Sequence, residues 1–74
     1  MPQTQDELVK LAIEEITPYA KKKGVSIDYS KDELRFYGYS KESSCEIRYM
    51  LMDSINKKLM EAGIVNRVKM AEKD

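Results

Sequence analysis

Two stretches of the chain repeat their apolar residues at the spacing of an amphipathic helix. In the first, apolar side chains recur every three or four positions over residues 8–20, and charged residues occupy the opposite side. Thr4 and Glu7 precede this run at the spacing of a capping box, in which each side chain bonds the backbone amide of the other residue. Pro18 removes one hydrogen bond from the helix interior. The pattern predicts a helix that begins after Thr4, is kinked by Pro18 and continues to about Lys23.

The second periodic stretch is longer and has two alternative starts. Either Ser40 or Ser43 has the side chain of a helix N-cap, and Ser43 with Glu46 forms another capping box. Gly63 is placed to end the helix in the left-handed conformation, with Ile64 folding back onto the last turn. Five apolar residues at helical spacing form the expected core stripe: Ile47, Leu51, Ile55, Leu59 and Ala62.

Between these two stretches, apolar and polar residues alternate with the period of a half-buried strand. The alternation covers residues 25–29 and 34–39, and the four residues between the runs are polar. Two strands joined by so short a link predict a β-hairpin, although no Asn-Gly or Asp-Gly pair specifies its turn. After the second helix, residues 64–70 form either a third strand or an ordered extension.

An amphipathic helix and a hairpin each leave an apolar face that another element must cover. Two helices packed on one face of a small antiparallel β-hairpin sheet satisfy both requirements. The sequence therefore predicts an α+β fold in the order helix, strand, strand, helix, with a third strand at 64–70 left open. We expect residues 1–74 to form a single domain, with residues 1–3 and 71–74 frayed.

The composition is that of a small water-soluble globule. Apolar residues make up 42% of the 74 residues and charged residues 35%, and no apolar run approaches the roughly 18–20 residues that span a bilayer. The first residues have no signal-peptide pattern, and the single cysteine, Cys45, is typical of a reducing compartment. These features favour a cytoplasmic protein that does not associate with membranes.

Residue types that the common catalytic sites require are missing. The chain has no histidine, which excludes Ser-His and Cys-His pairs, and one cysteine cannot build a structural zinc site. Its three glycines stand alone at positions 24, 38 and 63 and form no phosphate-binding loop. We therefore expect a protein that is not an enzyme and that binds no cofactor or metal.

The charges of the chain balance, because it has 13 basic and 13 acidic residues. Strong non-specific binding to nucleic acid depends on Lys and Arg that neutralise phosphates, and a neutral chain is poorly suited to it. The run of lysines at 21–23 is typical of a solvated helix C-terminus, where cations also interact favourably with the helix dipole.

The second helix has more apolar surface than one core contact requires. Tyr49, Met52 and Met60 widen its apolar arc to on the order of 220°, whereas a helix with one buried side needs roughly 100–140°. Met and Tyr suit adaptable contact surfaces. This flank is therefore either a wrapped part of the core, including the floor for a C-terminal strand, or an interface with a partner or with a second copy of the chain.

One face of the second strand is another candidate surface. Arg35, Tyr37 and Tyr39 are expected to project together, away from the face that bears Leu34 and Phe36. Aromatic side chains beside an arginine can stack the bases of RNA or of single-stranded DNA. The same residue types are favoured where proteins bind proteins. Both interpretations stay open, and the zero net charge favours a protein partner.

Residues 25–62 resemble the C-terminal half of the DinI-like proteins. The resemblance rests on a short hairpin, a glycine and a Ser-Lys-Glu helix start, in the order Val25-Ser26-Ile27-Asp28-Tyr29, then Leu34-Arg35-Phe36-Tyr37-Gly38-Tyr39-Ser40-Lys41-Glu42. DinI-like proteins bind a recombinase filament through an acidic helix, so the resemblance implies a partner in DNA recombination. The small size and the lack of catalytic residues are also similar to phage-encoded inhibitors of host DNA-processing machinery.

Two shorter segments resemble other families. Gln5 and Leu8 have the Gln-x-x-Leu spacing of sliding-clamp-binding peptides, although the segment lies where the first helix must bury Leu8 and Leu11. The segment Gly38-Tyr39-Ser40-Lys41 resembles the helix start of double-stranded-RNA-binding domains.

The leading hypothesis is a non-catalytic protein-binding module that inhibits or modulates a host DNA replication, recombination or transcription protein, for example a recombinase filament or a sliding clamp. Its expected contact residues are Tyr49, Met52 and Met60, and a homodimer is a further expectation. The alternative is a small RNA- or single-strand-binding module that uses the strand face with Arg35, Tyr37 and Tyr39.

Overall fold

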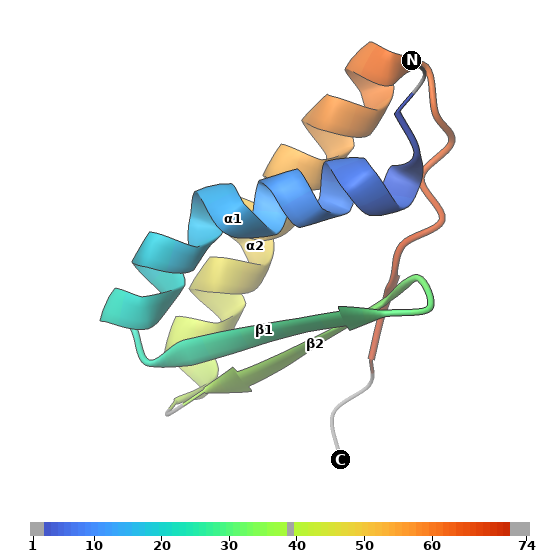
Figure 1. The fold of residues 1–74 in the computed structure, drawn as a ribbon. Coiled ribbons are helices and arrows are strands. Elements are labelled where there is room, and N and C mark those ends of the chain that lie inside the picture. Colours follow the sequence, from blue (N-terminus) through green and yellow to red (C-terminus); the bar gives the residue numbers. More distant parts are fainter. Residues whose placement is uncertain (1–2, 39, 72–74) are drawn as a thin grey trace.

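The computed structural model describes residues 3–38 and 40–71, which form two layers (Figure 1). One layer is a three-stranded sheet, and the other is a pair of helices that packs on it. The order helix, strand, strand, helix, strand confirms the predicted α+β fold. The elements are α1 Gln5–Lys22, β1 Val25–Ser30, β2 Glu33–Gly38, α2 Lys41–Ala62 and β3 Lys69–Met70.

Helix α1 begins where the capping box predicted it. The Thr4 hydroxyl accepts a hydrogen bond from the Glu7 amide, and the Glu7 carboxylate accepts one from the Thr4 amide. Pro18 lies inside the helix, and the Thr17 hydroxyl beside it donates to the Ile13 carbonyl at 2.6 Å. The helix nevertheless continues past the proline to Lys22, about one more turn.

The first of the two alternative starts of α2 is the one that forms. Ser40 is the N-cap, and its hydroxyl accepts a hydrogen bond from the Ser43 amide at 3.1 Å. At the other end Gly63 is left-handed with a φ of 71°, and the Ile64 amide donates to the Leu59 carbonyl. The predicted end of this helix is confirmed.

The hairpin turn is tighter than the polar link in the sequence indicated. β1 and β2 pair antiparallel with Ser30 opposite Glu33, which leaves only Lys31 and Asp32 in the turn. Both have positive φ, at 50° and 65°, as in the type I′ turns whose twist matches that of a hairpin. Because this conformation costs a non-glycine residue roughly 1–2 kcal/mol, contacts from other parts of the chain must hold the turn.

Only the end of the expected third strand forms, and it makes the sheet mixed. β3 runs parallel to β2, with Glu33 opposite Lys69 and Leu34 opposite Met70. Residues 64–68 form an extension without strand pairing. The predicted hairpin is antiparallel as expected, but the complete sheet is not.

The core lies between the helix pair and the covered face of the sheet. Ile47, Leu51 and Ile55 of the predicted α2 stripe have no exposed surface, and Leu34 of β2 is equally buried. Ala62, the last residue of the predicted stripe, is exposed instead. The other core residues come from both helices and from β1: Leu8, Val9, Ala12, Ile16, Ala20, Val25 and Leu59.

The two ends of the described chain are held differently. Gln3 is exposed ahead of α1, whereas the Ala71 amide donates to the Leu34 carbonyl at 2.9 Å. The other residues expected to fray, 1–2 and 72–74, lie outside the described residues. In the part of the chain that the structure describes, no helix has the length and apolar character needed to cross a membrane.

Gly38 ends β2 at a point where there is no room for a side chain. A Cβ added there would collide with the hydroxyl of the buried Ser44 and lie 3.2 Å from Val25 Cγ2. We predict that Gly38→Ala lowers the free energy of unfolding by about 1–3 kcal/mol, measured by urea denaturation, because the packed neighbours must move.

Gly63→Ala is the matched control, because only its positive φ opposes a side chain and the space around it is open. Its expected cost is about 1 kcal/mol, from backbone conformation alone. Adding Ser44→Ala should recover part of the loss in Gly38→Ala and none of the loss in Gly63→Ala. If Gly38→Ala lowered the free energy of unfolding by the same amount in the parent chain and in Ser44→Ala, the steric explanation would be contradicted.

Candidate functional site

The two surfaces predicted to bind a partner lie in different layers. Tyr49 and Met60 are exposed on α2, in the helix layer. Arg35 and Tyr37 lie on the face of β2 opposite to the buried Leu34. Because the helices cover the other face of the sheet, the two sets belong to different layers and form separate surfaces (Figure 1).

The α2 surface consists mainly of Tyr49 and Met60, which are 72% and 79% exposed. At 100° per residue both lie opposite the buried stripe, and they are about 16 Å apart along the helix axis. Asn56 and Cys45 fall on the same side of the helix and are also exposed. The surface is therefore a polar helix face with two large, adaptable apolar side chains.

Met52 differs from the other two predicted contact residues of α2. It is half-buried and packs against the core. One turn earlier, the guanidinium carbon of Arg48 lies 5.5 Å from the ring centroid of Phe36 on β2. Part of the wide apolar arc of α2 thus covers the sheet. Of the three contact residues predicted on this helix, Tyr49 and Met60 are exposed and Met52 is not.

The uncovered face of the sheet is electrically balanced. Arg35 forms an ion pair with Glu33 on the same strand at 2.8 Å and lies opposite Asp28 of β1. Tyr37 is 57% exposed beside them, and Tyr39, the third predicted residue, lies outside the described residues. An arginine flanked by two carboxylates contributes little positive potential for a phosphate backbone.

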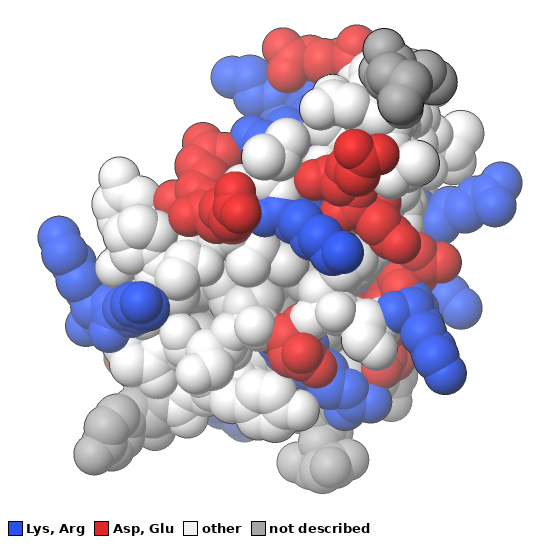
Figure 2. Space-filling view, in the orientation of Figure 1, with Lys and Arg blue, Asp and Glu red and all other residues white. Residues whose placement is uncertain are grey.

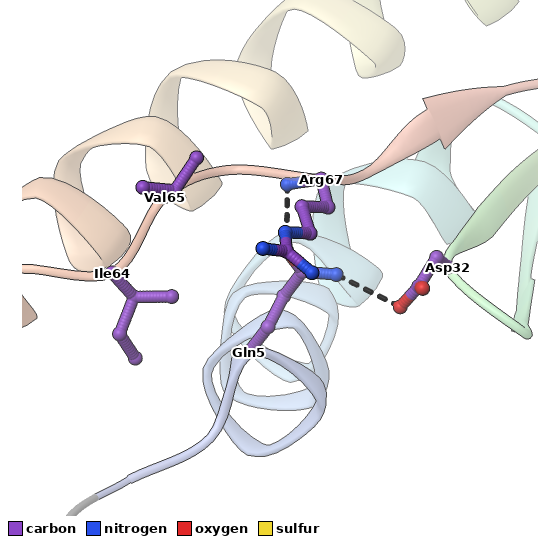
Figure 3. Close-up of a pocket in the computed structure, with 5 residues that line it drawn as sticks. All are labelled: Gln5, Asp32, Ile64, Val65 and Arg67. Carbon is purple, nitrogen blue, oxygen red and sulfur yellow. Dashed lines mark hydrogen bonds between the residues drawn. The ribbon is translucent and has the colours of Figure 1, made fainter.

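A polar cluster that the sequence did not indicate joins the start of α1, the hairpin turn and the extension after α2 (Figure 3). The Gln5 side-chain amide donates to the Asp32 carboxylate at 2.9 Å, and the Gln5 side-chain carbonyl accepts from the Arg67 backbone amide at 2.7 Å. An open hollow of about 390 Å³ surrounds Gln5, with Ile64 and Val65 on its apolar side. The cluster supplies the contacts that the strained turn requires.

Tyr29 joins this cluster from β1. Its hydroxyl donates to the Asp6 carboxylate at 2.7 Å and lies 3.4 Å from the Asp32 carboxylate. Burial of the ring, followed by the hydrogen bond to Asp6, raises the pKa of Tyr29 to about 12. The sequence carried no signal for this cluster, because its members are neighbours only after the chain folds.

The two defining residues of the Gln-x-x-Leu segment already make contacts within the fold. Gln5 bonds two other parts of the chain, and Leu8 is only 5% exposed in the core. A sliding clamp could bind these two side chains only after α1 had left the core. The geometry therefore gives both residues a role in the fold.

The thiol of Cys45 is the remaining group with reactive chemistry. Cys45 is exposed near the start of α2. Within residues 3–38 and 40–71, no three Cys, Asp or Glu side chains lie close enough together to hold a metal ion.

We predict that Tyr29 makes stability fall between about pH 10 and pH 12. The unfolded chain ionises this hydroxyl near pH 10, whereas the fold keeps it neutral to about 12. Its contribution is therefore complete below about pH 10 and is lost as the pH rises through the folded pKa. Urea unfolding of the parent chain and of Tyr29→Phe isolates this effect from the lysines, which titrate in both proteins.

The difference in unfolding free energy between the two proteins should shrink steadily across that range. A difference that stays constant from about pH 9 to pH 12 would show that the Tyr29 hydroxyl is not held in its neutral form.

No family model, curated protein or solved structure matches this chain. The resemblance to the DinI-like proteins therefore stays a prediction, and the function has to be argued from the surfaces of the chain itself.

Proposed function

We propose that the chain is a non-catalytic protein-binding module whose contact surface is the Tyr49 and Met60 face of α2. The observation that supports this most is the exposure of two large side chains on a helix whose other side already fills the core. The fold does not need either side chain. Tyrosine and methionine are enriched where proteins bind proteins, and charged residues are depleted there.

The energy of such an interface would come from covering these two side chains. Removing an exposed large apolar side chain from water stabilises a complex by roughly 1.5–3 kcal/mol. A methionine adapts its shape to an irregular partner surface, and a tyrosine adds a hydroxyl at its rim. Exposed polar residues of the same face, such as Asn56, would surround these contacts.

We infer that the partner belongs to DNA replication, recombination or transcription, and that the protein inhibits or modulates it. This part of the proposal is supported by the resemblance of residues 25–62 to the DinI-like proteins and by the small size of the chain. A recombinase filament is the first candidate to test. The sliding clamp ranks below it, because Gln5 and Leu8 are both used inside the fold.

Nucleic-acid binding through the sheet ranks lower than protein binding. Tyr37 is exposed enough to stack a base, but Arg35 beside it is paired with Glu33 and faces Asp28. Affinity for a phosphate backbone grows with the number of basic groups that contact it.

We predict that Tyr49→Ala combined with Met60→Ala weakens the complex with the partner at least about tenfold, as expected for central contact residues. The free energy of unfolding should change by less than about 0.5 kcal/mol, because both side chains are solvent-exposed. Titration of a purified recombinase filament with labelled chain measures the affinity, and urea denaturation measures the stability.

Tyr37→Ala is the matched control, since it removes an exposed tyrosine from the other layer. It should leave the affinity unchanged. Loss of binding in Tyr37→Ala, with full binding in the α2 double variant, would move the contact to the sheet and overturn the proposed surface.

We also predict that single-stranded DNA and RNA bind more weakly than about 100 µM even near 50 mM salt, where phosphate-driven affinity is greatest. Fluorescence anisotropy with labelled oligonucleotides measures this. Tight binding that weakens with added salt and is lost in Arg35→Ala would instead establish the nucleic-acid function.

A further inference from the structure

The outward face of α1 has acidic residues toward its start and basic residues toward its end. Figure 2 shows mostly Asp and Glu atoms over the N-terminal part of this helix, with basic atoms between them, and basic atoms at its C-terminal end. The exposed Lys10 is the base among the acids of the first half. The residues opposite the core recur at alternating steps of four and three and are all exposed: Glu7, Leu11, Glu14, Pro18 and Lys21. We refer to these five residues as the α1 stripe.

The helix dipole explains the charges at the two ends of the stripe, because acids stabilise a helix start and bases a helix end. It does not explain the apolar side chains between them. Leu11 is 44% exposed, and Pro18 is exposed as well. Shallow hollows flank Leu11 on both sides, one toward Ala62 at the end of α2 and one along α1 toward Glu14. Leu11 therefore projects between two hollows, and side chains of a second molecule could pack around it.

The charges of the stripe are also free of ion pairs within the described chain. The neighbouring Glu15 is bound by Lys58 of α2 at 2.6 Å, and Lys23 is bound by Glu46 at 2.7 Å. The described residues provide no such ion partner for Glu7, Glu14 or Lys21. One oxygen of the Glu7 carboxylate accepts hydrogen bonds from Thr4, which leave its charge unneutralised.

We propose that the α1 stripe binds the α1 stripe of a second copy of this chain, with the two helices antiparallel. Reversing the stripe about Glu14 places Glu7 opposite Lys21 of the second copy and Leu11 opposite its Pro18. A two-fold axis repeats each contact, so the dimer has two acid–base pairs and two apolar contacts. The charge pattern thus selects a second copy as the partner, in one orientation: a parallel arrangement would set acid against acid.

One contact of this arrangement is unfavourable. Glu14 lies at the centre of the stripe and faces Glu14 of the second copy. The interface is also a single helix pair, which belongs to the small class below about 1,200 Å². The dimer is therefore weak and salt-sensitive, and Glu14→Gln should tighten it several-fold.

Charge exchange across the stripe provides a sharp test. Glu7→Lys alone and Lys21→Glu alone each set like charges against each other twice in a homodimer, so each variant should be monomeric. An equimolar mixture restores both acid–base pairs between unlike chains. Sedimentation velocity over roughly 10 µM to 1 mM chain should show a dimer for the parent and for the mixture. Each variant alone should bind itself at least about tenfold more weakly.

Several outcomes would overturn the proposal. The first is a parent chain that stays monomeric over the whole concentration range, and the second is a mixture of the two variants that does not pair. The third is a dimer that Tyr49→Ala combined with Met60→Ala abolishes, because this would place the dimer interface on α2. Glu7 also caps α1, so circular dichroism must confirm that Glu7→Lys is folded. Lys21→Glu and Leu11→Arg leave the capping box intact, and both must produce monomers even where Glu7→Lys fails to fold.

Discussion

Burial of one stripe of α2 is the interaction on which the rest of the structure depends. A sheet of two six-residue strands and a third of two residues cannot enclose a core by itself. α2 contacts α1, β1 and β2, whereas α1 packs on β1 and on α2. Ile47, Leu51 and Ile55 are completely buried at this junction. Removing the stripe would leave α1 and the hairpin with no common partner.

The same constraint explains why α2 offers a surface. Its core contacts follow one line along 22 residues, so the opposite line faces solvent over nearly the whole length of the molecule. Apolar residues beside the stripe, such as Met52, wrap around the edge of the core. Tyr49 and Met60 lie on the side of α2 opposite the stripe, so their side chains do not reach the core. Their exposure follows from the position of α2 in the fold. The presence of large apolar residues at two exposed positions does not follow from it, and this is what requires a functional explanation.

Local signals in the sequence were enough to predict the elements and their caps. Thr4 with Glu7, Ser40, and Gly63 each act within a few residues, so their chemistry can be recognised without knowing the fold. The tight turn at Lys31 and Asp32 was not predictable in this way. Its residues are neither glycine nor asparagine, and the contact that holds Asp32 comes from Gln5, the first residue of α1, which is 27 positions away in the sequence.

The candidate surfaces were predictable only in part, for a similar reason. Periodicity assigned Tyr49 and Met60 to the flank of α2, but it could not separate them from Met52, whose burial depends on where the sheet lies. Alternation placed Arg35 and Tyr37 on one strand face. It could not show that Arg35 forms an ion pair with Glu33, because the sequence assigned Glu33 to the link between the strands, whereas it is the first residue of β2.

The two proposed contacts are compatible because they use different sides of the helix layer. Lys58 of α2 contacts α1 through Glu15, whereas Tyr49 and Met60 project away from that side of the helix. Two copies joined through α1 would therefore present two α2 faces at once. On a partner with repeated binding sites, such as a filament, the second chain of the dimer would bind after the first is already attached. This second step is intramolecular, and the geometry of the dimer sets its effective concentration. A module of 74 residues gains most from this, since one small contact surface is weak when it acts alone.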